Sequence, residues 1–226
     1  MNILVDDKIE TLETSTPKRV EQIGNSYYNL FPTPVSMNQI GRDFTKKELD
    51  FVRKQERRPN MGNFTSADHY VLKHKELASI NKFIEKCLNN FYQSVFSPRD
   101  DVEIYITQSW LNYTEPGQFH HKHAHPNSFV SGVLYLNATA EKDKIYFYNE
   151  NYKQIKLPPQ QWNVWNSESW WLPVENGSCV VFPSHFTHMV ETVESDDNRD
   201  TRISLSFNTF LKGNIGDEAS LTGLRL

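Results

Sequence analysis

The chain has 226 residues, of which 38% are hydrophobic and 23% charged, a composition typical of a folded globular protein and not of a disordered one. Its 24 Lys and Arg residues against 28 Asp and Glu residues give a formal net charge of −4, so no overall positive field attracts nucleic acid. No apolar run reaches the roughly 18–20 residues that a membrane-spanning helix needs, and the N-terminus lacks a secretory signal pattern. We therefore expect a cytoplasmic protein without membrane or nucleic-acid partners, whose two cysteines, Cys87 and Cys179, are buried thiols.

The first hundred residues predict an extended segment followed by two helices. Residues 1–43 show no sustained hydrophobic period and include Leu-Phe-Pro-Thr-Pro, which favours an extended chain. Thr45 followed by Glu48 predicts a capping box at the start of a helix over about residues 45–57. Over residues 75–96, apolar side chains recur at three- and four-residue steps, which predicts a helix that packs on a sheet. These apolar residues are Leu77, Ile80, Phe83, Ile84, Cys87, Leu88, Phe91 and Val95.

From residue 102 onward the hydrophobic period changes to two, the period of a β-strand. The candidate strands are residues 102–113, 128–138, 144–149, 162–166, 170–174, 178–182, 188–193 and 201–210. Because no helix separates these strands, we expect a mainly β fold with flanking α-helices, a sandwich or jelly roll with the N-terminal helices packed on its sheet. The expected organisation is one domain, 1–226, made of an extended segment (1–43), helical support (44–100), a jelly-roll core (101–210) and a C-terminal tail (211–226).

Four of the eight histidines lie within six residues, in the sequence Phe-His-His-Lys-His-Ala-His-Pro between two predicted strands. Alternate side chains of an extended chain share a face, so His121, His123 and His125 are expected to project together and His120 to point away. Histidines at this spacing can chelate one ion, and imidazole suits Zn, Fe, Ni and Cu. The alternative is that these histidines are only solvated or hydrogen-bonded at a strand edge. Four histidines at this spacing make that alternative the less favoured one.

A second histidine pair and a polar strand face lie further along the chain. His185 and His188 follow a buried strand and a proline turn, and either could complete the metal site. On the last predicted strand, Arg202, Ser204 and Ser206 share one face and hydrophobic residues share the other. A guanidinium buried inside the barrel needs an anionic partner, and a dicarboxylate ligand would be one. On a solvated face, Arg202 would instead pair with an acidic residue of the preceding loop.

The order of these motifs resembles the Fe(II)/2-oxoglutarate-dependent dioxygenase superfamily, and in particular a prolyl-hydroxylase-like branch found in bacteria and their viruses. The motifs are the early Leu-Phe-Pro-Thr-Pro, His-x-His-Pro, Ser-Gly-Val-Leu-Tyr-Leu-Asn, Phe-Pro-Ser-x-x-x-His and Arg-Ile-Ser, spread over about residues 30–210. The resemblance implies a double-stranded β-helix that binds Fe(II) and uses 2-oxoglutarate and O2. The implied reaction is the hydroxylation of a substrate, coupled to the decarboxylation of 2-oxoglutarate to succinate and CO2.

The resemblance also implies the metal ligands, which would be the catalytic residues: His123, His125 and His188. His123 is preferred to His121 because Tyr113, which fits a pocket position of prolyl hydroxylases, lies ten residues before it. Most of the superfamily has Asp or Glu where this chain has His125. Imidazole in place of a carboxylate leaves the metal with one more unit of positive charge, which should alter its affinity and redox behaviour.

Four further residues match cosubstrate positions of the family. Arg202 would pair with the distal carboxylate of 2-oxoglutarate, and Ser204 would assist it. Tyr135 and Tyr113 would line the cosubstrate pocket. A planar guanidinium can hold a carboxylate through two parallel hydrogen bonds, which explains the use of Arg at such a position.

Two other protein classes share part of this pattern. A cupin-like metal isomerase would have the jelly roll and the histidines but would not need Arg202 and Ser204. A non-catalytic metal- or sugar-binding module would close its metal site with a fourth ligand such as His121. If the protein is viral, it would act in the host cytoplasm.

No motif names the substrate or the oligomeric state. The candidate substrates are a prolyl residue of a protein or peptide and a small molecule. Four tryptophans could form a wall that faces the substrate, although large aromatic side chains on strands more often pack in the core. These are Trp162, Trp165, Trp170 and Trp171.

Overall fold

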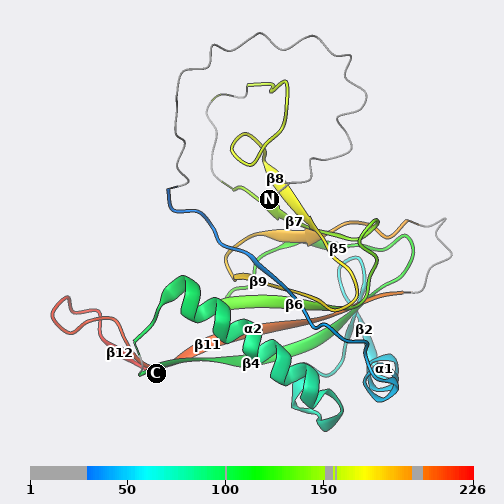
Figure 1. Ribbon diagram of the computed structural model, residues 1–226, viewed down its shortest axis with the longest axis horizontal. Helices are drawn as coiled ribbons and strands as arrows, with labels where there is room; N and C mark the ends of the chain where they lie inside the picture. Colours follow the sequence, from blue (N-terminus) through cyan, green and yellow to red (C-terminus); the bar gives the residue numbers. More distant parts are fainter. Residues whose placement is uncertain (1–29, 100, 151–154, 156, 195–200) are drawn as a thin grey trace.

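The computed structural model describes residues 30–99, 101–150, 155, 157–194 and 201–226 (Figure 1). The expectations for residues 1–29 and for positions 195–200 of the acidic loop lie outside the described residues. In the described part of the chain, no helix is long and apolar enough to cross a membrane.

The described elements are mainly short strands. In chain order they are β1 (Ser36–Gln39), α1 (Lys46–Arg53), β2 (Arg57–Pro59), β3 (Phe64–Ser66), the 3-10 turns η2 (Val71–Lys73) and η3 (Lys75–Leu77), α2 (Ala78–Phe96), β4 (Val102–Thr114), β5 (His120–His123), β6 (Val130–Asn137), β7 (Lys144–Tyr148), β8 (Ser169–Pro173), β9 (Ser178–Pro183), β10 (His188–Val190), β11 (Arg202–Ile215) and β12 (Leu224–Arg225).

The strands form two antiparallel sheets. The larger sheet has the order β1-β9-β6-β11-β4-β3-β2, with β12 paired to β11, and the smaller has the order β5-β10-β7-β8. Side chains of β6 and β9 from the larger sheet pack against side chains of β7 and β10 from the smaller one, which forms a core between the sheets. This arrangement of antiparallel sheets is that of a jelly roll.

Helix α1 begins where the sequence predicts. The Thr45 side chain accepts a hydrogen bond from the backbone of Glu48, and the Glu48 carboxylate accepts one from the backbone of Thr45, so the capping box is confirmed. The helix ends at Arg53, before the expected position 57, because Arg57 already pairs with Ser66 in the β2–β3 ladder.

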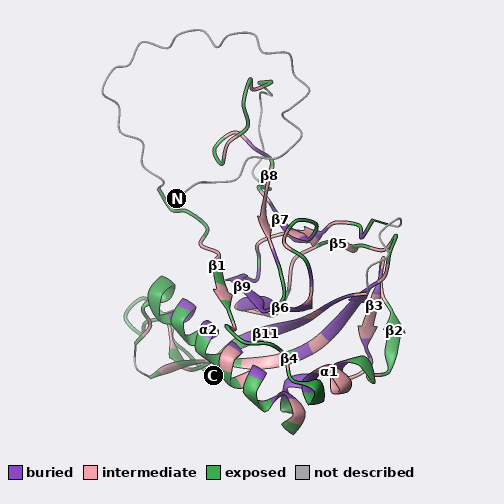
Figure 2. Cartoon of the chain, turned by 45° about the vertical axis from the view of Figure 1, so that its right-hand side comes forward, coloured by how far each residue is buried: buried purple, intermediate pink, exposed green. Residues whose placement is uncertain are grey.

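Helix α2 covers one face of the larger sheet (Figure 2). Its apolar stripe shares a core with β4, β6, β9 and β11, and both cysteines are free and buried, as expected. Val95 was expected in that stripe but is 38% exposed. The last turns instead direct Tyr92 and Phe96 toward Phe129, whose ring lies 4.7 Å from that of Phe96.

Most of the expected strands are present with ends shifted by a few residues, but the strand predicted over 162–166 is wrong. That segment is a turn. The Asn163 side chain accepts a hydrogen bond from the backbone N–H of Trp165 at 2.9 Å, and the Asn163 carbonyl accepts one from Ser167 at 3.0 Å. Asparagine here satisfies backbone donors that a strand would pair with a neighbour. Strands β1, β2, β3, β5 and β12, which have two to four residues each, were not predicted.

Candidate metal centre

Two adjacent strands of the smaller sheet bring the predicted metal ligands together. His188 at the start of β10 lies directly opposite His123 at the end of β5. His125 lies just beyond β5, where its backbone N–H donates to the Ser184 carbonyl at 2.9 Å. The candidate ligand nitrogens of His123, His125 and His188 all lie within 4.8 Å of one another. These three side chains could therefore hold one metal ion.

Backbone carbonyls fix two of the three imidazole rings. Nδ1 of His123 lies 2.7 Å from the His121 carbonyl, and Nδ1 of His188 lies 3.0 Å from the Phe186 carbonyl. A carbonyl only accepts, so each Nδ1 carries the proton and each Nε2 keeps a free lone pair. Nε2 of His125 lies 3.3 Å from Nε2 of His188. Two nitrogens bound to one tetrahedral zinc ion, at about 2.0–2.1 Å each, lie at about that separation.

The three histidines are held in their neutral form, the form that binds metal. Burial, followed by the neighbouring His123 and His125, lowers the pKa of His188 to about 3. Burial and then His123 lower the pKa of His125 to about 4, while a hydrogen bond with the Asn208 side chain acts in the opposite direction. Burial also lowers the pKa of His123. At neutral pH this group adds no charge of its own, and a divalent ion bound here keeps its full positive charge.

The other histidines of the two motifs take different positions. His185 is exposed, so of the distal pair only His188 joins the cluster. The expectation that His120 points away is wrong, because its ring stacks on that of His123 with the ring centres 4.7 Å apart. The β5–β10 register explains this: His188 pairs with His123 and Val190 with His120, so three residue steps along β5 oppose two residue steps along β10. This β-bulge breaks the alternation on which the expectation rested.

Arg202 lies at the start of β11 and is buried. Of the two alternatives, a solvated strand face and a face inside the barrel, burial agrees with the second. Among the residues that the structure describes, the anionic partner of Arg202 is Asp143, a fully buried residue directly before β7. One guanidinium nitrogen donates to Asp143 Oδ1 at 3.0 Å and the other donates to the Glu191 carbonyl at 3.1 Å. The carboxylate also accepts the Thr139 N–H at 2.9 Å. A ligand is therefore not needed to balance the charge of Arg202.

Tyr135 lies beside this ion pair with an unsatisfied hydroxyl. It is 1% exposed, pairs with Ser204 across β6 and β11, and its side chain belongs to the core between the two sheets. Burial raises its pKa, Arg202 opposes that shift and Asp143 adds to it. Among the buried side-chain atoms that the structure describes, the Tyr135 hydroxyl and Asn112 Oδ1 are those without a hydrogen-bond partner. A buried hydroxyl without a partner is costly, so its position next to a cation is a suitable place for a ligand oxygen.

The structure contradicts the prediction that Tyr113 lines the cosubstrate pocket. Its hydroxyl donates to the Val52 carbonyl of α1 at 2.6 Å, and the Arg57 guanidinium lies 4.1 Å from its ring centre. Successive strand residues face opposite ways, so the inner position on β4 belongs to Asn112, which sequence reasoning missed. The Asn112 amide donates to Ser206 Oγ at 2.9 Å.

The tryptophans divide between the turn and the smaller sheet. Trp162 and Trp165 are 44% and 65% exposed. Trp170 and Trp171 are half-buried on β8, where the Lys144 ammonium lies 4.1 Å from the centre of the Trp171 ring. Trp171 therefore contributes to the packing of strand β8 on β7, the more common role of a large aromatic residue on a strand.

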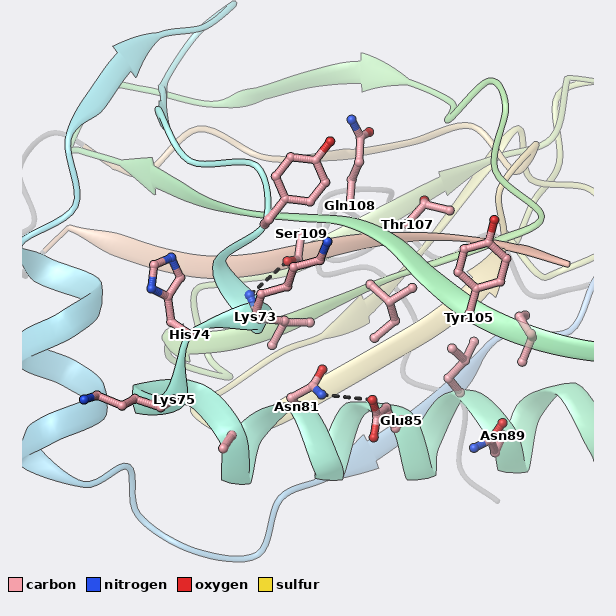
Figure 3. A pocket seen from close by; sticks show the side chains of 16 residues that line it. Lys73, His74, Lys75, Asn81, Glu85, Asn89, Tyr105, Thr107, Gln108 and Ser109 are labelled. Atoms are coloured by element: carbon pink, nitrogen blue, oxygen red, sulfur yellow. Dashed lines mark hydrogen bonds between the residues drawn. The ribbon is translucent and has the colours of Figure 1, made fainter. Parts of the chain in front are cut away.

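A separate groove of about 610 Å3 lies between α2 and β4, on the helix-covered side of the larger sheet (Figure 3). None of its lining residues was predicted as a site residue. Its polar groups largely satisfy one another: Asn81 donates to Glu85 at 2.9 Å, and Ser109 Oγ accepts the backbone N–H of Leu72 at 3.0 Å. The histidine cluster is not part of this groove.

Comparison with known proteins agrees with this geometry. Residues 108–208, which contain the three clustered histidines, Tyr135 and Arg202, match the family model described as putative 2OG-Fe(II) oxygenase. The comparison with curated proteins finds no match to the sequence.

Several solved structures share the fold. An oxidoreductase of the 2OG-Fe(II) oxygenase family from Burkholderia pseudomallei is 15% identical, with a TM-score of 0.53 over 77% of this chain and 83% of its own. A prolyl hydroxylase from Trichoplax adhaerens, in complex with a hypoxia inducible factor peptide fragment, is 12% identical, with a TM-score of 0.53 over 78% and 83%. HygX from Streptomyces hygroscopicus, with nickel and 2-oxoglutarate bound, is 8% identical, with a TM-score of 0.50 over 78% and 82%. The similarity to the Fe(II)- and 2-oxoglutarate-dependent oxygenase superfamily therefore covers residues 108–208, and the fold is shared with a prolyl hydroxylase.

Proposed function

We propose that the protein is a hydroxylase of this superfamily that binds Fe(II) through His123, His125 and His188. The observation that carries the proposal is the orientation of the rings. Two Nδ1 protons are donated to backbone carbonyls, which leaves Nε2 lone pairs available in a cluster whose candidate ligand nitrogens lie within 4.8 Å of one another. In the superfamily, bound iron with 2-oxoglutarate and O2 supplies the oxidising power that converts a C–H bond to C–OH and releases succinate and CO2.

The chain's own residues would position the ligands and exclude water. Hydrophobic side chains of the core between the sheets surround His188: Phe182 lies 4.6 Å from it between ring centres, and Phe147 lies 6.1 Å away. Trp110 approaches His125 with its ring centre 5.9 Å away. Rings packed in this way hold the imidazoles in place and keep bulk water from the metal.

For the cosubstrate, we propose that Arg202 and Tyr135 bind the distal carboxylate of 2-oxoglutarate, with Ser204 near them. The Tyr135 hydroxyl has no partner, and a guanidinium has five N–H donors, more than the contacts with Asp143 and the Glu191 carbonyl require. Asp143 reduces the electrostatic attraction at this position because it already neutralises Arg202. We therefore expect hydrogen bonds to contribute more to carboxylate binding here than net charge does.

The proposal is tested under anaerobic conditions by calorimetry. Fe(II) should bind with a stoichiometry of one per chain, and 2-oxoglutarate should bind to the Fe(II)-loaded protein. A prolyl peptide and small-molecule substrates can then be compared by succinate release in the presence of O2. Absence of 2-oxoglutarate binding to the iron-loaded protein would reject the oxygenase mechanism and favour a non-catalytic metal site.

A further inference from the structure

The histidine cluster contains a second possible metal site. The candidate ligand nitrogens of His120, His121 and His123 also lie within 4.8 Å of one another. We call this group the outer set, and the group of His123, His125 and His188 the inner set. All three residues of the outer set are half-buried, whereas His188 of the inner set is 6% exposed. The two sets have one residue in common, His123.

The bulge in β5 creates the outer set. It turns His120 toward His123, so that consecutive residues on one strand direct their rings to the same place. The ring centre of His121 lies 4.8 Å from that of His123 and 5.4 Å from that of His120. Without the bulge, His120 would point to the opposite face and the outer set would have only two members.

His123 can serve only one of the two sets at a time. Its Nδ1 lies 2.7 Å from the His121 carbonyl and therefore carries the proton, so Nε2 has the single lone pair available for a metal. His121 is oriented in a similar way, since its Nδ1 lies 3.3 Å from the Met61 carbonyl. Both sets thus compete for the same nitrogen atom.

We propose that the outer set binds a divalent transition-metal ion, with Zn2+ as the representative, and that this ion excludes metal from the inner set by taking His123. Three imidazoles without a carboxylate suit Zn2+, Ni2+ and Cu2+, all of which bind nitrogen ligands more tightly than Fe2+ does. The existence of the outer site is independent of the proposed function. The further statement that zinc at the outer set interferes with iron binding at the inner set rests on the proposed function.

The test isolates the outer set by removing two inner ligands. In the double variant His125→Ala and His188→Ala, calorimetric titration with Zn2+ at neutral pH should still give one ion per chain. Adding His123→Ala to this background should weaken Zn2+ binding at least a hundredfold, and adding His121→Ala at least tenfold. Adding His185→Ala, a histidine that is exposed and belongs to neither set, should change nothing.

Three outcomes would overturn the inference. Loss of Zn2+ binding in the His125→Ala and His188→Ala protein would show that the outer set does not bind metal on its own. Two ions per chain in the unaltered protein would show that His123 is not shared. An equal effect of His185→Ala and His121→Ala would show that binding is unspecific. Because alanine can disturb the fold, the pair His125→Gln and His188→Asn is titrated in parallel, and circular dichroism is used to confirm that each variant is folded.

The complementary variant separates this inference from the proposed function. With His120→Ala and His121→Ala, the inner set remains complete, so Fe(II) and 2-oxoglutarate should bind as in the unaltered protein. If this variant fails to bind Fe(II) while the His125→Ala and His188→Ala protein still binds Zn2+, the proposed function is contradicted and the outer site is supported.

Discussion

The proposed metal end and the proposed cosubstrate end of the barrel differ in how their polar side chains are paired. At the metal end, nearby backbone carbonyls accept the Nδ1 protons of His123 and His188, so the lone pairs of these two rings lie on Nε2. At the other end, the cation Arg202 is already paired with Asp143, and the unsatisfied group is the hydroxyl of Tyr135. We therefore expect metal binding to depend on each of the three histidines, and carboxylate binding to depend on several groups that partly compensate for one another.

The largest expected effect is at the metal end. His188→Ala removes the ligand that comes from a different strand, so stoichiometric Fe(II) binding should disappear in anaerobic calorimetry. His185→Ala is the matched control, because this exposed histidine lies three residues earlier and belongs to neither histidine set. Undiminished Fe(II) affinity in the His188→Ala protein would locate iron in the outer set.

A second prediction concerns the pH dependence of the metal-free protein. The pKa of His188 falls from 6.5 to about 3 on folding, and that of His125 falls to about 4. Between the folded and the unfolded pKa values, the unfolded chain binds more protons than the folded chain. The contribution of these two histidines to folding stability is therefore fully present above about pH 6.5, and it is lost as the pH falls toward 4 and 3. Urea unfolding between pH 7 and pH 4 measures this. The variant His188→Gln, which has no titrating imidazole, should show a shallower decline, and an unchanged slope would contradict the assignment.

At the cosubstrate end, Arg202→Lys should weaken 2-oxoglutarate binding while metal affinity changes little. An ammonium group cannot reproduce the two parallel hydrogen bonds of a guanidinium, and a charged hydrogen bond is worth about 1.5–3 kcal/mol, or roughly a ten- to hundredfold change in affinity. Titration of 2-oxoglutarate into Fe(II)-loaded protein measures this. Equal affinity would mean that Arg202 has a structural role through Asp143 alone.

A change at Asp143 should have the opposite effect on 2-oxoglutarate binding. Asp143→Asn removes the negative charge beside Arg202 and keeps the shape of the side chain, so 2-oxoglutarate should bind several-fold more tightly, in the same titration. A weaker affinity would show that Asp143 is needed to hold Arg202 in position. The free energy of unfolding should fall, because the change leaves a buried guanidinium without its ionic partner.

The smallest expected effects distinguish two buried tyrosines. Tyr135→Phe removes a hydroxyl that has no partner, so it should leave the ligand-free protein as stable or slightly more stable and weaken 2-oxoglutarate binding. Tyr113→Phe removes a donor to the Val52 carbonyl, so it should lower the free energy of unfolding by about 0.5–1.5 kcal/mol and leave 2-oxoglutarate binding unchanged. Thermal unfolding and calorimetry of the two variants measure both effects, and the reverse pattern would place Tyr113 in the pocket after all.

Features that depend on neighbouring residues in the chain could be predicted from the sequence. The period of three to four residues predicted α2, the period of two predicted seven strands, and Thr45 with Glu48 predicted the start of α1. The spacing of the histidines and the resemblance also selected the three residues that the structure brings together. These signals are local, so they do not require knowledge of which strands pair.

Features that depend on pairing between distant segments could not be predicted without the folded structure. The bulge opposite β10 turned His120 toward His123, and the register of β4 placed Asn112 rather than Tyr113 inside the barrel. Asp143 became the partner of Arg202 although 59 positions separate them in the chain. In a strand, a shift of one residue moves a side chain to the opposite face, so a count of residues along the sequence does not determine the side on which a residue lies.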